Sequence, residues 1–160
     1  MLKTKYQIAK VAILATVFIL LSACGGTKHF ITPLNKNIAG NVHVVDISVI
    51  TKSKPLTHKL KKAVLEETIK RLKGSHEVKL KIDVTNWQPA YNFEGVKTGS
   101  QRTTLAMLVT VLDAKTNAVV GKYNTSSFYH NDLNVTASGK NTNEHVIDTA
   151  AYFTAWQLEK

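Results

Sequence analysis

The sequence contains a single cysteine, Cys24, in 160 residues. One thiol cannot form a disulfide within the chain, and it cannot supply the paired cysteines of a structural zinc site. Phosphate-binding loops, dinucleotide-binding fingerprints and the HExxH zinc motif are also absent from the sequence. The fold must therefore be held together by its hydrophobic core, and we expect neither a cofactor nor a metal.

The sequence also lacks an apolar run long enough to span a bilayer. Its most apolar stretch, residues 11–21, is well short of the about 20 residues that a transmembrane helix needs. Lys3, Lys5 and Lys10 precede this stretch, and no acidic residue does. A positive start, a short apolar stretch and then small residues are typical of a secretory signal peptide. We therefore expect residues 1–23 to be a cleaved signal.

The apolar stretch ends in LSAC, residues 21–24, which resembles the lipobox of bacterial lipoproteins. The resemblance implies that the Cys24 thiol receives a diacylglycerol and that signal peptidase II cuts after Ala23. Gly25 follows the cysteine in place of Asp, which implies sorting to the outer membrane, with the domain facing the periplasm. A buried core cysteine and an uncleaved signal anchor are the alternatives.

Positive charge is concentrated in one part of the chain. The formal net charge is +10, and residues 52–81 hold ten Lys and Arg against three Glu. Such a segment is either solvated surface or a binding surface for an anionic partner. An exported protein rarely meets nucleic acid, so peptidoglycan, anionic lipid or an acidic protein patch is expected instead. The candidate contacts are Lys59, Lys62, Lys70, Lys73, Lys79 and Lys81.

Hydrophobic periodicity predicts one α+β domain over residues 42–160, preceded by a lipidated flexible tether over residues 24–41. Phe30 and Ile31 are expected to dock on the domain, and the tether to reach roughly 20–25 Å. The predicted elements are a strand at 42–51, a helix at 57–73, a strand at 77–87, a hairpin at 103–130 and a helix at 143–160. They predict a two-layer fold of order β-α-β-β-β-α, with an antiparallel or mixed sheet of about four strands and two helices on one face.

The alternation of apolar residues predicts which side chains face the core. In the first strand, Val45, Ile47 and Val49 are expected to point one way. In the first helix, the expected buried face holds Val64, Leu65, Thr68, Ile69 and Leu72, and Gly74 is expected to cap the end. Inward residues are also predicted in the second strand (Val78, Leu80, Ile82, Val84), the hairpin (Leu105, Met107, Val109, Val111) and the last helix (Val146, Ile147, Ala150, Ala151, Thr154, Leu158).

Three aromatic residues, Trp87, Tyr91 and Phe93, stand next to an irregular stretch at residues 88–102. Aromatic side chains on an exposed loop can anchor a protein partner. They can equally close over the edge of a hydrophobic core. Both interpretations stay open on the sequence alone.

The order of the elements is similar to that of small exported bacterial domains. These include the LpoB-type activators of peptidoglycan synthases, the N-terminal domain of TolB, the curli-secretion lipoprotein CsgG and several uncharacterised lipoprotein domain families. The most specific part is TLAMLVTVLDAKTNAVVGKY, residues 104–123, which resembles their hairpin, with Asn117 where those proteins usually have glycine. The resemblance implies a shared fold, an envelope location and a function in binding other proteins.

No arrangement of residues in the sequence predicts catalysis. Ser126, Ser127, His130 and Asp132 lie close together, but the GxSxG nucleophile elbow is absent. We therefore expect a non-catalytic binding or assembly module for an envelope protein complex. The alternative is a direct binder of anionic envelope polymers or lipids through residues 52–81, and a hydrolase is the least favoured hypothesis.

Overall fold

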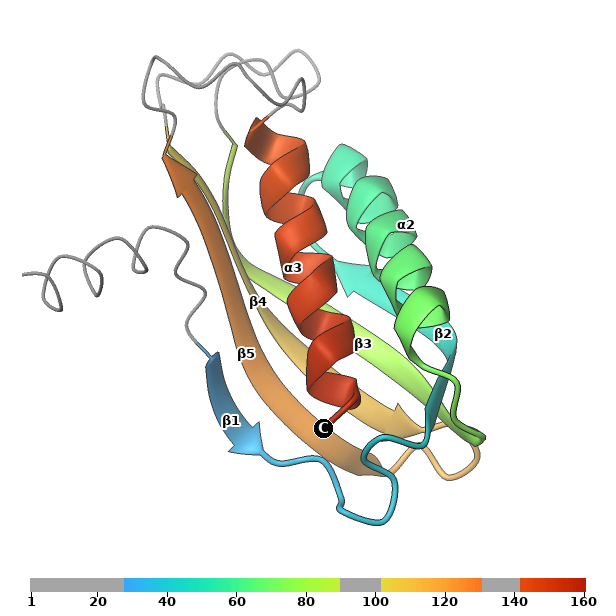
Figure 1. Cartoon of the computed structure of the whole chain (residues 1–160). Helices are drawn as coiled ribbons and strands as arrows, with labels where there is room; N and C mark the ends of the chain where they lie inside the picture. The colour runs from blue at the N-terminus through green and yellow to red at the C-terminus, as the bar shows by residue number, and fades with distance from the viewer. Residues whose placement is uncertain (1–27, 90–101, 131–141) are drawn as a thin grey trace, which may run out of the picture.

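A computed structural model of the chain describes residues 28–89, 102–130 and 142–160. They form an open five-stranded sheet, and both helices cover the same face of it (Figure 1). The predicted two-layer α+β fold is confirmed. The elements are β1 (Lys28–Thr32), β2 (Val42–Ile50), α2 (Lys54–Arg71), β3 (His76–Gln88), β4 (Arg102–Asp113), β5 (Val119–His130) and α3 (Thr142–Leu158).

The sheet is mixed, with the strand order β1-β5-β4-β3-β2. β2 pairs with β3 in parallel, and α2 makes the crossover between them. The other three pairs are antiparallel. The edges of the sheet are therefore β1 and β2, from the N-terminal part of the domain, and the long β4–β5 hairpin lies inside it.

The prediction of a flexible tether over residues 24–41 is wrong from Lys28 onwards. β1 adds a fifth strand to the sheet by pairing with β5. The chain after β1 also contacts the domain, since the Asn35 amide donates to the Val120 carbonyl at 3.1 Å and Ile38 is buried. The sequence gives β1 no alternating pattern, so this strand depends on pairing with a distant segment. The expected docking around Phe30 and Ile31 is in the right place but occurs as strand pairing.

The centre of the core is formed by β3 and β4, as the alternation predicts. In β3, Val78, Leu80 and Ile82 are buried, whereas Val84 is only partly buried. The four inward residues predicted for the hairpin, Leu105, Met107, Val109 and Val111, are also buried. Strict alternation places the remaining side chains of these strands on the opposite face of the sheet. We call it the uncovered face, because no helix or strand among the described residues packs on it.

β2 departs from the predicted alternation because it contains a bulge. Its register with β3 shifts between Val44 and Asp46. A bulge adds one residue to a strand and thereby reverses which side chains face inward beyond it. Val42 and Val44 are consequently buried before the bulge and Ile47 after it. The prediction that Val45 faces inward is wrong, since this side chain is exposed.

α2 begins at Lys54, three residues before the predicted start at residue 57. The Ser53 Oγ accepts from the Leu56 amide, and Pro55 occupies the first turn, where a missing amide hydrogen costs nothing. The buried stripe, however, is narrower than predicted and begins earlier in the helix, with Leu56, Leu60, Val64, Thr68 and, just beyond the helix, Leu72. Leu65 and Ile69, predicted to be buried, are exposed, because α3 packs against the other side of α2.

Gly74 does not cap α2 in the way predicted. The capping residue is Leu72, whose amide donates to the Thr68 carbonyl. Gly74 instead permits a close approach between two chain segments, because a Cβ there would overlap the backbone of Asn41 and Val42. Its amide also donates to the Val42 carbonyl at 3.2 Å.

Two other predictions about local structure are confirmed. Asn117 adopts a φ of 57° in the β4–β5 turn, in the left-handed region that glycine adopts most easily. All six residues predicted for the buried face of α3 are buried. Among the residues that the structure describes, neither helix is long and apolar enough to cross a membrane.

Candidate functional site

The candidate lysines are divided between two faces of the molecule. Lys59, Lys62 and Lys70 lie on α2, and Lys73 lies two residues beyond its end, so all four belong to the helix layer. Lys79 and Lys81 lie on β3, and they alternate with Val78, Leu80 and Ile82, which are buried beneath the helices. These two lysines therefore point to the uncovered face of the sheet. A single partner surface cannot contain all six lysines.

Three of these four lysines, Lys59, Lys62 and Lys70, have acidic neighbours. Lys59 lies 3.7 Å from Glu144 of α3. Lys62 lies 3.9 Å from Glu66. Lys73 Nζ donates to the backbone carbonyl of Ile69 at 2.6 Å. Exposed pairs of this kind contribute little to stability, but they place negative charges among the positive ones on this face.

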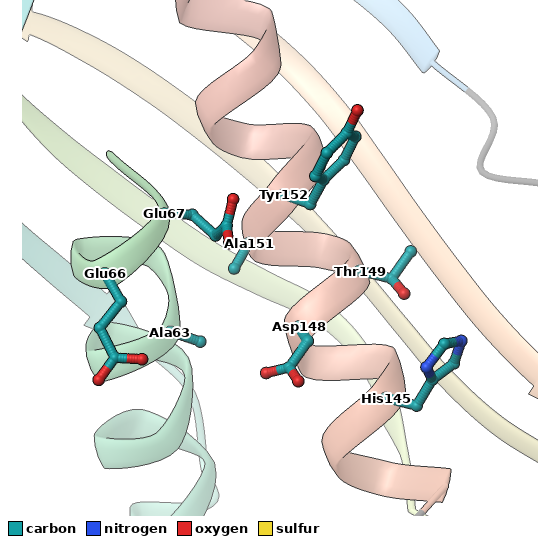
Figure 2. Close-up of a pocket in the computed structure, with 8 residues that line it drawn as sticks. All are labelled: Ala63, Glu66, Glu67, His145, Asp148, Thr149, Ala151 and Tyr152. Atoms are coloured by element: carbon teal, nitrogen blue, oxygen red, sulfur yellow. The ribbon is translucent and has the colours of Figure 1, made fainter. Parts of the chain in front are cut away.

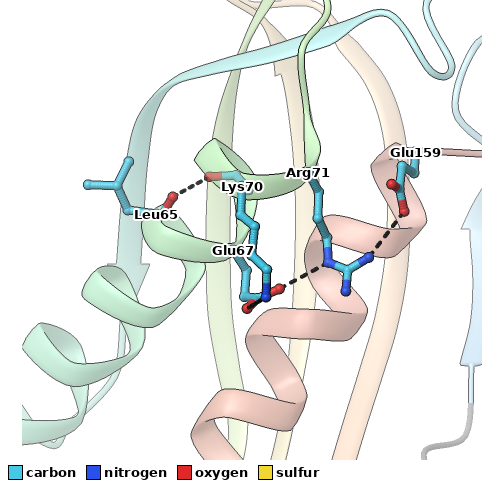
Figure 3. Close-up of polar contacts among 6 residues, drawn as sticks. Leu65, Glu67, Lys70, Arg71 and Glu159 are labelled. Carbon is cyan, nitrogen blue, oxygen red and sulfur yellow. Dashed lines mark hydrogen bonds and ion pairs between the residues drawn. The ribbon is translucent and has the colours of Figure 1, made fainter.

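One ion cluster connects the two helices near the end of α2 (Figure 3). Arg71 Nε donates to Glu67 at 2.9 Å, and Arg71 Nη1 contacts Glu159, just beyond α3, at 3.5 Å. Lys70 reaches the same Glu67 carboxylate at 3.6 Å, and the Arg71 guanidinium lies over the Tyr152 ring. The hydrogen bond to Glu67 is the main cause that raises the pKa of Arg71. The cluster fixes one end of the helix pair.

A groove separates α2 from α3 (Figure 2). Its volume is about 460 Å³, and the small side chains Ala63 and Ala151 leave room for it. A second hollow of about 280 Å³ shares Ala63, Glu66 and Asp148 with it and extends toward Lys59 and Lys62. The larger hollow is lined by Ala63, Glu66, Glu67, His145, Asp148, Thr149, Ala151 and Tyr152.

The groove mixes carboxylates, one imidazole and short apolar side chains. His145 lies edge-on to Tyr129, with ring centroids 5.3 Å apart. Within residues 28–89, 102–130 and 142–160, no group of three or more His, Cys, Asp and Glu is arranged to hold a metal ion. A shallow groove lined by three carboxylates, Glu66, Glu67 and Asp148, can accept a polar peptide segment or a side chain of another protein.

The uncovered face of the sheet brings together residues that are distant in sequence. The register places Lys81 opposite Thr110 of β4, and Thr110 opposite Lys122 of β5. Paired residues in adjacent strands share a face and stand about 4.8 Å apart. Ser48 of β2 pairs with Lys81, and Thr32 of β1 pairs with Lys122, so the line crosses the whole sheet. We call Ser48, Lys81, Thr110, Lys122 and Thr32 the lysine–hydroxyl row.

The acidic neighbours of the lysine–hydroxyl row are few. Asp83 lies 3.9 Å from Lys81. Glu77 is exposed on the same side of β3, nearer its start. Across the described part of the chain, no carboxylate lies within ion-pair distance of Lys122. The sequence alone does not single out Lys122, because only the strand register brings it close to Lys81.

Of the other residues considered in the sequence, some have a structural role and some lie outside the described residues. Trp87 is partly buried and packs against the core, which supports the core-edge interpretation for this side chain. Ser127 is buried and donates to the Val146 carbonyl at 2.9 Å, so its hydroxyl already has a structural role. Tyr91, Phe93, Ala23 and Cys24 lie outside the described residues.

Comparison with known proteins gives the fold but no family. No family model matches the sequence, and no curated protein matches it. Among solved structures, the PelC dodecamer from Paraburkholderia phytofirmans is similar with a TM-score of 0.56 at 13% identity, covering 84% of this chain and 98% of that one. Protein XCC0632 from Xanthomonas campestris has a TM-score of 0.53 at 13% identity, covering 79% and 90%.

A lipoprotein from Caulobacter crescentus also resembles the chain, with a TM-score of 0.43 and 21% identity over 71% of this chain and 87% of that one. The likenesses to PelC and XCC0632 show that the two-layer arrangement is shared along nearly the whole length of those proteins. At such identities they show the fold alone.

Proposed function

We propose that this protein is a lipid-anchored module of the bacterial envelope that acts by binding and assembly and not by catalysis. The observation that carries the proposal is the LSAC sequence, which stands immediately before a folded domain. Only residues 25–27 separate Cys24 from β1, so a lipid on that thiol is joined almost directly to the sheet. Gly25 supports sorting to the outer membrane, and the domain then faces the periplasm.

The surface of the domain supports a binding function. The helix layer offers a shallow groove, and the sheet offers a broad uncovered face that ends in β1 and β2, each of which pairs with only one strand among the described residues. Exposed strand edges and sheet faces are common sites of protein association. PelC, which shares the fold, is a dodecamer. By analogy, we propose that this protein also works within an assembly, formed either with its own copies or with another envelope protein.

Crosslinking in living cells tests the assembly. A photo-reactive amino acid at Leu65, exposed on α2, should trap a discrete larger species when the full-length chain carries its lipid. The matched control places the same group in the Cys24→Ala chain, which should lose the species if membrane attachment brings the partners together. Recovery of uncrosslinked chain alone, from Leu65 and from sites on the sheet face, would contradict the assembly while leaving the lipid anchor intact.

A second candidate function is direct binding of an anionic envelope polymer such as peptidoglycan through the basic segment 52–81. The lysines on β3 favour it, whereas those on α2 stand among glutamates. Sedimentation with isolated peptidoglycan should then weaken steeply as salt increases. Unchanged binding after charge reversal at Lys62, Lys70 and Lys73 would exclude the helix layer from that function.

A further inference from the structure

The side of α2 that faces away from α3 carries aliphatic side chains that the core does not use. Leu65 and Ile69 are 40% and 59% exposed, and they lie one turn apart on the same side of the helix. Lys54, His58 and Lys61 continue this side toward the start of α2, at spacings of three and four residues, and all three are exposed. We call Lys54, His58, Lys61, Leu65 and Ile69 the outer stripe. It contains no acidic residue.

The outer stripe lies at one edge of the domain, beside β2. Lys61 Nζ is 3.9 Å from Asp46 of β2, and Figure 1 shows α2 over β2, at the edge of the sheet opposite β1. Half of the eight large hydrophobic side chains that are exposed in the described part of the chain belong to these two elements: Val45, Ile50, Leu65 and Ile69. Apolar side chains that gather at one place among charged ones mark an interaction surface.

The edge of β2 is poorly suited to accept a strand from a partner. Its pairing with β3 is interrupted by the bulge between Val44 and Asp46, and the ion pair of Asp46 with Lys61 lies at this bulge. Bulges and charged side chains on an edge strand oppose pairing with another strand. Recognition therefore falls to the side chains of the outer stripe, and the spacing of Leu65 and Ile69 suits packing against another helix.

The charge around the outer stripe favours an acidic partner. Four lysines and two carboxylates lie on it or beside it: Lys54, Lys61, Lys62, Lys73, Asp46 and Glu66. The two ion pairs among them are 3.9 Å long, and their side chains are more than half exposed. Such pairs are weak, so their ammonium groups can turn to a partner. Two outer stripes would repel each other, whereas a surface with carboxylates beside aliphatic side chains is complementary.

The anchoring membrane is not the partner if Cys24 carries the lipid. Four peptide units join Cys24 to Lys28, and at about 3.6 Å per residue they reach about 14 Å. Four strand spacings of about 4.8 Å separate β1 from β2, which is about 19 Å. Turning the outer stripe onto the bilayer would raise β1 by this larger distance, beyond the reach of the connection. The outer stripe therefore faces away from the anchoring membrane.

We propose that the outer stripe of α2 docks an acidic amphipathic helix of another envelope protein. Leu65 and Ile69 pack against its aliphatic side chains, and Lys54 and Lys61 pair with its carboxylates. This inference rests on the binding function proposed above and names the surface and the kind of partner. The lipid anchor holds the β1 edge of the domain, and the opposite edge is presented to the partner.

Crosslinking from single positions tests the surface in cells that naturally make the protein. A photo-reactive amino acid at Ile69 of the full-length lipidated chain should give one product of discrete size, in which the second chain is a different protein. Mass spectrometry should place the crosslink in a helical segment with Asp or Glu within one turn of an aliphatic residue. The matched control is Val119, an aliphatic residue of similar exposure at the start of β5, which should give no product.

Charge reversal tests the complementarity. Lys54→Glu with Lys61→Glu should lower the yield of the Ile69 product by about fivefold or more, because two attractions become repulsions. The control, Lys81→Glu with Lys122→Glu, makes the same change of charge on the uncovered face and should leave the yield unchanged. Thermal unfolding of both double variants verifies that each is folded.

Four results would overturn the docking surface. They are a product that contains only this chain, a product with lipid, a yield that ignores the charge reversal at Lys54 and Lys61, and a product from Val119 or the uncovered face with none from Leu65 or Ile69. The absence of any product from every position would overturn the proposed assembly together with its surface. Failure of the lipid anchor is a separate result, because such a chain would not sediment with the membranes.

Discussion

Lys81 and Lys122 stand on either side of Thr110 on the uncovered face of the sheet, although they come from different strands and distant parts of the chain. Two like charges in this arrangement gain nothing from each other. Natural sheets usually alternate charges across strands, because opposite charges stabilise the pairing. Lys81 has an acidic neighbour in Asp83, 3.9 Å away, whereas in the described part of the chain no carboxylate lies within ion-pair distance of Lys122. The arrangement yields a direct test of the register.

Substitution of Thr110 should change stability in opposite directions according to charge. Thr110→Glu places a carboxylate between the two lysines and should raise the free energy of unfolding by about 0.5–1 kcal/mol. Thr110→Lys should lower it by a similar amount. Denaturant unfolding of both variants at low salt measures the difference. Equal stabilities would mean that Lys81 and Lys122 do not flank this position.

Gly74→Ala should be strongly destabilising. The new Cβ would overlap the backbone of Asn41 and Val42, and neither segment can move without breaking the β2–β3 pairing. We expect a loss of more than about 2 kcal/mol in the free energy of unfolding. The control is Gly40→Ala, at a φ of 75° with more space around it, which should cost only about 1 kcal/mol. A smaller loss at Gly74 than at Gly40 would contradict the close approach.

The Tyr123 hydroxyl is buried and donates to the Thr154 carbonyl at 3.0 Å, which joins β5 to α3. Tyr123→Phe should cost about 1 kcal/mol at neutral pH. Burial raises the pKa of Tyr123 well above its usual value. Above about pH 10, a tyrosine ionises in the unfolded chain while Tyr123 stays neutral in the folded one, so the folded state loses stability as pH rises.

The measurement for Tyr123 is therefore a comparison of unfolding at pH about 9 and about 11. The wild-type protein should lose more stability over this interval than Tyr123→Phe. Tyr152→Phe, which removes an exposed hydroxyl, serves as the control and should follow the wild type. Parallel pH profiles for all three proteins would contradict the burial of the Tyr123 hydroxyl.

Asp113 should make the folded state sensitive to acid. Its carboxylate accepts from the Thr116 amide and hydroxyl, both at 2.8 Å, and from the Lys115 amide at 3.1 Å. The bonds from Thr116 are the main cause that lowers the pKa of Asp113. In the unfolded chain the pKa of an aspartate is about 3.9, and in the folded chain that of Asp113 is lower. The folded state is therefore stabilised above pH about 3.9 and loses this stabilisation as the pH falls through the lower pKa.

Asp113→Asn keeps an acceptor in the turn but removes the titration. Thermal unfolding of this variant should therefore fall less steeply between pH about 5 and about 2 than that of the wild-type protein. An unchanged acid dependence would show that the turn does not hold the carboxylate as described.

Local patterns in the sequence predicted much of the fold. The alternation in β3 and β4, the buried face of α3 and the positive φ of Asn117 each depend on residues close in the chain, and all are confirmed. The errors arise where a distant segment decides the outcome. β1 needs β5, the bulge at Val45 appears only in register with β3, and α3 determines which side of α2 is covered.

The candidate site shows the same limit. The basic segment at residues 52–81 is continuous in sequence, but the fold divides it between one helix and one strand on opposite faces. In the sheet, neighbours across strands matter more than neighbours in sequence. For this reason Lys122 was missed, while the lysines of α2 were included although glutamates lie beside them.

The most direct test of the central claim is the intact mass of the protein isolated from membranes of cells that express the full sequence. The proposal predicts a chain that begins at Cys24, residues 24–160, with a mass increased by a diacylglycerol and, where the amino group is acylated, by one more fatty acid. A mass equal to the chain from Met1, or to a chain cut elsewhere and carrying no lipid, would contradict it.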